Sequence, residues 1–587
     1  MKRICRPVLF LLTMAATYAC HRMPATANDE TFDYREIYLP YSFMCDEKEL
    51  GLNNVERDWA IWGHNLSRVV PERHSNSIYA NVGGNTVKKQ FCFSSPQLQI
   101  YISKFIDEEC GNNRPQRFAV LPNDNDIVCQ CARCRELGCT PTDATPAVFA
   151  LLDKLAANYP KHKFFTSYYL TTRQLPKAPL PDNVGVLVSA MDYPLSAVET
   201  PRERKFEQLL KDWSSVCRNV YVWDYINNFD DYYTPFPIYA VVQRRLQLYA
   251  RTGVKGVFLN GSGHDYSTFN RINTYVLAAL LSSPDADWRE VLTETCRRFF
   301  PTAGETLARF RMEQEDYVVA TGRILPLYDG VAAAVRSYLP RESFLDFYAK
   351  MERLAASTSG SEGAGINRIL RAVTLTRLEL MRLDGIAPEE VGKARALLAR
   401  LDSIDDVSVV NMNGKKWETR IYSESYWTVD NYISDYRQML DLCAEQKENI
   451  LLHQPLTALT RLDEDYSDLS VLTDGMAGLP GNYHCGQLIS SANPSLNIAL
   501  PAGHRYRRVR AGLTSNIQFR IALPLRVTLS CGGREIGSIV PSPVLAPSGR
   551  TTVEFNVPDW ANQGTLVLRF FRNPEVHTMA IDEIEAY

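Results

Sequence analysis

Between about residues 35 and 261 the sequence alternates short β-rich runs with longer helical patterns, and this alternation constrains the fold more than any other feature. Two of the runs, Phe118–Leu121 and Val257–Leu259, are almost entirely apolar, which is typical of strands covered on both faces. Such alternation is the signature of parallel βαβ units. The predicted strands are Glu36–Tyr41, Trp59–Trp62, Arg117–Leu121, Lys163–Tyr169, Gly185–Ala190, Asn219–Trp223 and Gly256–Leu259.

The helical stretches between these runs begin with a proline, which the first turn of a helix tolerates. They cover residues 96–109, 146–159, 201–213 and 237–251. Because about eight βα units close a barrel, we predict an α/β fold with a (β/α)8 TIM barrel over residues 30–320. A doubly wound open sheet is the alternative fold, but no glycine-rich phosphate loop follows the first predicted strand.

The rest of the 587-residue chain has two further textures, as expected for a length that exceeds one hydrophobic core. Apolar residues recur at helical spacing after the barrel, which predicts a helical region over residues 321–450, with Ser357–Gly365 as a flexible connection. Short β-rich runs separated by turn residues predict a jelly-roll-like β-sandwich over residues 465–587.

The first residues are typical of an export leader, which we place at residues 1–27. Lys2 and Arg3 give a basic start, and the apolar run Pro7–Ala19 that follows is short for a membrane span. Cys20 then stands where a lipoprotein is processed and lipidated. The sequence therefore predicts a bacterial outer-membrane or cell-surface lipoprotein, in contact with a membrane only through its lipid anchor. Cleavage near Ala27 would instead give a periplasmic or secreted protein.

Charge and motifs exclude several classes of function. Lys and Arg total 64 against 67 for Asp and Glu, giving a net charge of −3 without long runs of one sign, so a nucleic-acid partner is not expected. The chain has no Gly-x-Ser-x-Gly elbow, no His-Glu-x-x-His pair and no phosphate loop. Serine hydrolase, zincin and nucleotide-dependent functions lack support, and no cofactor is predicted.

Polar and aromatic residues follow the predicted strands, at the end where parallel barrels carry their functional groups. Amides and phenols suit sugar hydroxyls, and an indole suits the apolar face of a sugar ring, so an oligosaccharide or polysaccharide is the expected partner. The predicted substrate-binding residues are His64, Asn123, Asp126, Tyr168, Asp192, Trp223, Tyr225, Asn227 and Asn260. His64 in a structural role and Trp223 as a plug of the barrel remain the alternatives.

Glycosidic hydrolysis generally needs one protonated carboxyl and a second group that meets the positive charge developing on the sugar. Asp124 and Asp224 follow or end different strands, so we predict them as the catalytic pair, with Asp126 and Asp192 in reserve. Two structural alternatives stay open. Asp124 and Asp126 suit an Asx-turn, and Asp224 suits a buried partner of an arginine.

Four cysteines cluster at Cys129, Cys131, Cys134 and Cys139. In an oxidising compartment such a cluster forms disulfides, and four soft ligands in a short loop can instead bind zinc. The spacing C-x-C-x2-C-x4-C is not a zinc-ribbon pattern, so the sequence favours disulfide bracing of a loop over a metal site.

Three separated segments resemble a known family. Leu121–Asp126 with Cys129–Cys134 resembles the hallmark of domain of unknown function family 4838, and Trp223–Phe229 and Gly253–Phe258 resemble two further segments of that family. The resemblance covers about residues 35–310. It implies a glycosidase-type barrel related at the level of fold to β-hexosaminidases and α-glucuronidases.

The chain departs from these relatives in two places. The leader runs almost directly into the first predicted strand, whereas many members carry a small α/β domain before the barrel. Asn123–Asp126 has no glutamate where hexosaminidases carry adjacent Asp and Glu, which argues against substrate-assisted cleavage. Leu472–Gly475 resembles the start of a discoidin-like carbohydrate-binding sandwich.

Two functions from different classes follow. The first is a glycoside hydrolase that cleaves complex glycans with paired carboxylates. The alternative is a non-catalytic surface glycan-binding protein on a TIM-barrel scaffold, which would bind glycans and release no product.

Overall fold

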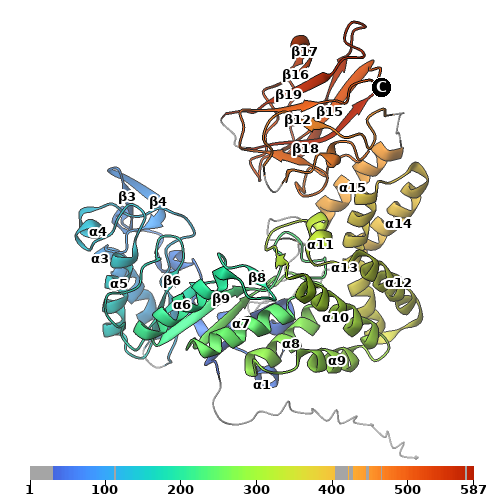
Figure 1. Ribbon diagram of the computed structural model, residues 1–587. Coiled ribbons are helices and arrows are strands. Elements are labelled where there is room, and N and C mark those ends of the chain that lie inside the picture. The colour runs from blue at the N-terminus through green and yellow to red at the C-terminus, as the bar shows by residue number, and fades with distance from the viewer. Residues whose placement is uncertain are drawn as a thin grey trace, which may run out of the picture.

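A computed structural model describes residues 31–45, 47–111, 114–403, 421, 423, 428–444, 449–463, 466–574 and 578–587. The predicted leader, with Cys20, lies outside these residues. A parallel sheet with its helices forms one end of the molecule, a group of helices follows it, and antiparallel sheets form the C-terminal end (Figure 1). No helix among the described residues is long and apolar enough to cross a membrane.

All seven strands predicted in the first half of the chain are present, and all pair in parallel. The sheet order is β1-β10-β9-β7-β6-β5-β2, so the first strand of the chain lies beside the last, as in a barrel. The strands are β1 Tyr34–Tyr38, β2 Trp59–Ile61, β5 Arg117–Ala119, β6 Lys163–Tyr168, β7 Val184–Ser189, β9 Asn219–Tyr225 and β10 Gly256–Asn260.

The closed eight-stranded barrel that the sequence predicted is not confirmed. Strands β1 and β2 are the two edges of the seven-stranded sheet, and the structure shows no pairing between them among the residues it describes. The sheet is therefore a curled half-barrel. Its edges still approach each other through side chains, since the indole N–H of Trp59 donates a hydrogen bond to the Tyr34 hydroxyl at 2.8 Å. After β10 the chain enters helix α8 (Asn270–Ser282) in place of a further paired strand.

Aromatic rings fill the concave side of the half-barrel. One buried cluster takes a side chain from each of the seven strands, and its rings meet across the sheet rather than only between neighbours. Tyr34 of β1 stacks on Tyr221 of β9 at 5.4 Å, and Tyr221 in turn meets Phe165 of β6 at 4.7 Å. Glycine makes room for these rings, because a Cβ at Gly256 would lie 2.6 Å from the ring of Tyr221. Large rings thus pack closely against small residues on this side of the sheet.

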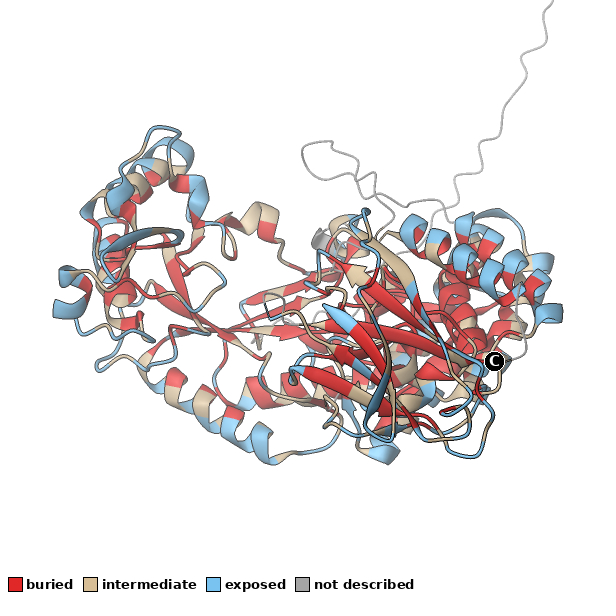
Figure 2. Cartoon of the chain, turned by 90° about the horizontal axis from the view of Figure 1, so that it is seen from above, coloured by how far each residue is buried: buried red, intermediate tan, exposed pale blue. Residues whose placement is uncertain are grey.

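Helices cover the convex side of the sheet, and their outer faces are exposed (Figure 2). The sequence specifies where several of them begin. Prolines occupy the first turn of α3 and α5, and Thr200 forms a capping box with Glu203 at the start of α6. The bounds are α3 Pro96–Phe105, continued by the π-helical turn Ile106–Cys110, α5 Thr145–Asn158, α6 Pro201–Val216 and α7 Tyr239–Arg251.

Helices fill the chain between the half-barrel and the C-terminal sheets, and they begin before residue 321, where the sequence predicted the boundary. Its helices are α9 Trp288–Phe299, α10 Gly304–Thr321, α11 Val331–Ser337, α12 Arg341–Ser357, α13 Gly360–Asp384, α14 Val391–Asp402 and α15 Val429–Ala444. The flexible connection predicted at Ser357–Gly365 is wrong, because α13 begins at Gly360. The Glu362 carboxylate accepts hydrogen bonds from the backbone of Thr302 and Ala303, and this contact orders the segment.

The C-terminal residues form two antiparallel sheets, of order β12-β14-β19-β16-β17 and β13-β20-β15-β18, around one apolar core. Buried residues run along these strands as they do along the half-barrel (Figure 2). The strands are β12 Thr457–Ala458, β13 Leu488–Ser490, β14 Ser495–Ala499, β15 Arg508–Asn516, β16 Arg526–Cys531, β17 Arg534–Ile539, β18 Ser548–Asn556, β19 Leu566–Phe571 and β20 Met579–Ala586. The predicted β-sandwich is therefore observed.

Candidate functional site

Two tryptophans lie at the carboxyl end of the half-barrel interior. Trp62 directly follows the edge strand β2, and Trp223 belongs to β9, which is four strands away in the sheet order. Their rings stack at 4.9 Å with 14° between the planes, and Phe258 packs against both. Both indoles are half-buried. They form an aromatic floor at the end of the sheet where parallel strands place functional groups.

A row of polar side chains follows three adjacent strands at this end. Asp124 comes after β5, Tyr169 directly after β6, and Asp192 after β7. Burial, the negative charge of Asp124, a hydrogen bond to Asp124 and the charge of Asp192 together raise the pKa of Tyr169 to about 12. Tyr169 is therefore a neutral phenol lying between two exposed carboxylates.

Asp192 has a cationic partner, since its carboxylate lies 2.5 Å from a guanidinium nitrogen of Arg173. Both side chains are exposed at the rim. His64 is fixed differently. Its Nδ1 lies 2.6 Å from the carbonyl of Pro122, and because a carbonyl only accepts, Nδ1 carries the hydrogen and donates. This bond orients the imidazole, which lies 6.2 Å from the ring of Tyr169.

The Asn-Asp loop after β5 divides its side chains between two roles. The amides of Asn123 and Asn125 both donate to the carbonyl of Lys89 in β4 (Asn85–Phe91), and the Asn125 side chain accepts from the backbone of Ile127. Asp124 and Asp126 are exposed instead. The Asx-turn thus belongs to Asn125. The amide of Asn123 helps to hold the loop, and its role in substrate binding stays a prediction.

The prediction of Asp224 as a catalytic residue is also corrected. Neighbouring residues alternate across a strand, so Trp223 faces the interior while Asp224 faces the helices. Its carboxylate is 1% exposed and accepts hydrogen bonds from Arg245 at 2.7 Å and from the Tyr249 hydroxyl at 2.5 Å. The carboxylate is sealed between β9 and α7, which is the structural alternative that the sequence left open.

The remaining predicted residues vary in position. Tyr168 points outward, where its ring meets Trp213 of α6 at 6.0 Å, so the phenol at the site is Tyr169 in its place. Tyr225 and Asn227 are buried, and Asn260 is half-buried at the end of β10. Asp126 is exposed on the same loop as Asp124.

Trp62, Tyr169 and Arg173 are not among the site residues predicted from the sequence. Which of two neighbouring residues at a strand end faces the site could not be read from the sequence. Glu36 was missed for another reason, since it lies inside a predicted strand. Its side chain is 1% exposed and accepts hydrogen bonds from the backbone of Val55 at 2.8 Å and from the Tyr34 hydroxyl. Burial raises the pKa of Glu36 to about 8. It is a protonated carboxyl in the half-barrel wall, at the β1 edge.

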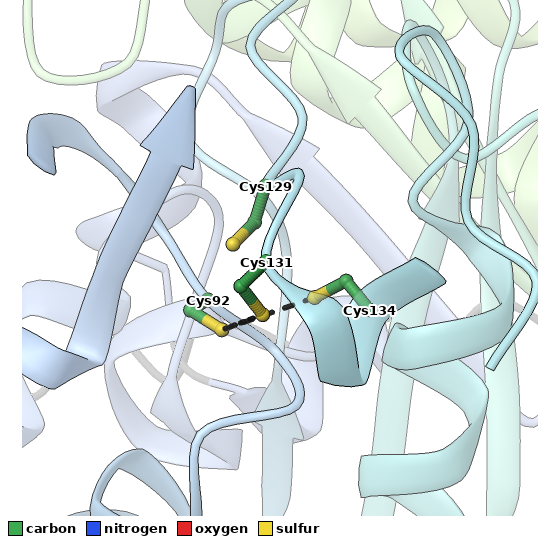
Figure 3. A group of neighbouring side chains, drawn as sticks. All are labelled: Cys92, Cys129, Cys131 and Cys134. Atoms are coloured by element: carbon green, nitrogen blue, oxygen red, sulfur yellow. Dashed lines mark hydrogen bonds between the residues drawn. The ribbon is translucent and has the colours of Figure 1, made fainter. Parts of the chain in front are cut away.

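The cysteines form a different group from the predicted one. Cys92, which follows β4, joins Cys129, Cys131 and Cys134, and the four Sγ atoms all lie within 4.8 Å of one another (Figure 3). Cys139 is not one of these four; its thiol contacts that of Cys134, and its Sγ lies 3.8 Å from the carbonyl of Ala144. Every cysteine that the structure describes is a free thiol, so the predicted disulfide bracing is not observed.

The half-barrel matches the model of one protein family. The model of the family described as domain of unknown function (DUF4838) matches residues 25–312. Residues 25–312 are thus similar to that family. The match includes β1 to β10 and all residues of the candidate site, and it confirms the resemblance inferred from the three sequence segments.

The solved structures similar to this chain are remote. A family GH115 4-O-methyl-alpha-glucuronidase with specificity for decorated arabinogalactans is 11% identical, covering 84% of this chain and 67% of its own, with a TM-score of 0.34. A GH138 enzyme targeting pectin rhamnogalacturonan II is 10% identical, covering 83% and 77%, with a TM-score of 0.26.

A chitosan-binding module from a chitosanase/glucanase of Paenibacillus sp. IK-5 is 13% identical, covering 24% of this chain and 99% of its own, with a TM-score of 0.17. No curated protein matches the chain.

Proposed function

We propose that the protein is a glycoside hydrolase that binds a complex glycan at the carboxyl end of the half-barrel, over Trp62 and Trp223. The observation that carries the proposal is the combination of an aromatic floor with two carboxylates on either side of Tyr169. An indole face packs against the apolar face of a sugar, while carboxylates and phenols bind hydroxyls and exchange protons.

The catalytic pair in this proposal is Asp124 and Asp192, since Asp224 is sealed in the helical layer. Tyr169 is a neutral phenol hydrogen-bonded to Asp124, and we assign this pair to the proton transfer to the leaving oxygen. Asp192 pairs with Arg173 and suits the carboxylate that meets the positive charge on the sugar carbon or activates a water. Tyr169 positions Asp124 through its hydrogen bond.

A glycan-binding protein without catalysis is the second candidate. It is favoured by one observation, the stacked Trp62–Trp223 pair, which offers a sugar platform whether or not the carboxylates act. The two candidates share the binding surface and differ in whether a bond is broken.

Released sugar from a panel of plant, host and microbial glycans separates the candidates. For a substrate found with the wild-type chain, Asp124→Asn and Asp192→Asn should each lower kcat/KM by about 100-fold or more, because each removes a group used in proton transfer or charge stabilisation. The matched control is Asp182→Asn. Asp182 is also exposed and also pairs with an arginine, Arg218. It lies before β7, at the opposite end of the strand from Asp192, so its replacement should leave cleavage unchanged.

Unchanged cleavage in both variants would contradict the assignment of the pair. Saturable binding without product from any glycan would favour the non-catalytic candidate.

A further inference from the structure

The group of four cysteines has the dimensions of a metal site. A tetrahedral zinc ion with Zn–S bonds of about 2.3 Å has sulfur atoms about 3.8 Å apart. In the structure the Sγ of Cys92 lies 3.7 Å from that of Cys131 and 3.8 Å from that of Cys134, and all four sulfurs lie within 4.8 Å of one another. The spacing therefore fits four thiolates around one small ion.

The four residues come from two segments that need a cross-link. Cys92 follows β4 of the β3–β4 hairpin (β3, Tyr79–Val82), whereas Cys129, Cys131 and Cys134 lie before or in the short helix α4 (Ala132–Glu136), and their side chains converge (Figure 3). Three of them are buried and Cys131 is half-buried. Two ligands from a C-x2-C segment, Cys131 and Cys134, joined by a distant cysteine, form a common arrangement of structural zinc sites.

Polar groups around the sulfurs suit thiolates. The backbone N–H of Asn81 donates to the Sγ of Cys129 at 3.3 Å, and the Ser94 hydroxyl lies 3.1 Å from the Sγ of Cys134 and 3.3 Å from that of Cys92. Hydrogen bonds from such outer partners orient thiolate ligands and offset their charge.

We propose that Cys92, Cys129, Cys131 and Cys134 bind one zinc ion as a closed structural site. Four protein ligands leave no open position for substrate, so the ion has no direct part in hydrolysis. The site ties the β3–β4 hairpin to the loop that leads from Asp124 to α4, alongside the bonds from Asn123 and Asn125 to Lys89. Zinc therefore holds one wall of the candidate site in place.

The test is the metal content of the full chain, purified without chelators from zinc-supplemented cells. We expect about one equivalent of zinc per chain, and after exchange with Co²⁺ the charge-transfer and visible bands of a tetrahedral thiolate complex. Cys131→Ser, at the half-buried ligand, should lower the zinc content at least tenfold. Cys139→Ser is the matched control on the same loop and should keep the full equivalent.

Zinc release by a mercurial thiol reagent on the wild-type chain tests the site without any substitution, because four reacting thiols should release one zinc. Wild-type protein with less than a tenth of an equivalent of zinc, also after reduction and zinc addition, would overturn the proposal. Disulfides between these cysteines in the purified chain, or a full equivalent of iron in place of zinc, would also overturn it. The same holds if Cys139→Ser loses its zinc while Cys131→Ser keeps it.

Discussion

The Asp224 carboxylate lies 2.7 Å from a guanidinium nitrogen of Arg245, and both side chains are buried between β9 and α7. Arg245 also donates to the carbonyls of Tyr193 and Pro194, so one buried ion pair ties β9 and α7 to the chain after β7. The contact gives Asp224 a structural role and moves the candidate chemistry to Asp124 and Asp192.

Replacing Asp224 should therefore affect stability first. Asp224→Asn leaves the Arg245 charge buried without its counter-ion, and removing one partner of a buried pair costs about 3–5 kcal/mol. Asp124→Asn changes an exposed side chain and should alter the free energy of unfolding by less than about 0.5 kcal/mol. Urea unfolding of the two variants measures both values. Equal stability of the two would contradict the role given to Asp224.

Glu36 should make stability depend on pH. The folded chain keeps the Glu36 proton up to about pH 8, whereas the unfolded chain loses it near pH 4.5. Between these values the folded state binds more protons, so the free energy of unfolding falls as the pH rises, by up to about 1.4 kcal/mol per pH unit.

Glu36→Gln should remove this contribution. Measured by urea unfolding from pH 4 to 9, the variant should gain stability relative to the wild type between pH 4.5 and 8, and the difference should level off above that range. Parallel curves for the two proteins would show that Glu36 is not protonated in the folded chain.

Gly185 tests the packing of the half-barrel interior. A Cβ at Gly185 would lie 2.3 Å from the ring of Phe165 and 2.8 Å from the carbonyl of Asn219, so Gly185→Ala should cost about 1–3 kcal/mol by overpacking. Gly392→Ala is the control. Its Cβ meets nothing within 4 Å, and alanine in helix α14 should stabilise by about 0.5–1 kcal/mol. A thermal melt of each variant should show shifts of opposite sign.

The half-barrel strands could be predicted because apolar runs such as Val257–Leu259 leave few alternatives in an alternating βαβ pattern. Closure could not be predicted, since it depends on whether β1 and β2 come within hydrogen-bonding distance. Side-chain direction was the other limit. A shift of one residue along a strand reverses the face, which is why Tyr168 was selected where Tyr169 lies at the site.

The cysteine group shows the same limit over a longer distance. Cys129, Cys131 and Cys134 lie within six residues of one another and were selected with Cys139. Cys92 lies 37 residues before Cys129 and reaches the group only because the β3–β4 hairpin folds over the loop. Local spacing carries no information about that contact.

The proposed function requires that a glycan lies over the Trp62–Trp223 pair. The most direct test is a calorimetric titration of the Asp124→Asn chain with a glycan. The glycan is the one found by sugar release, or the one found by binding if no product forms. In this background Trp62→Phe and Trp223→Phe should each weaken binding by about tenfold, close to 1.4 kcal/mol, while Trp560→Phe, an exposed indole of the sandwich, should leave it unchanged. If both the Trp62 and Trp223 variants bind with the affinity of the Asp124→Asn chain, or if only Trp560→Phe weakens binding, the glycan does not lie over the Trp62–Trp223 pair.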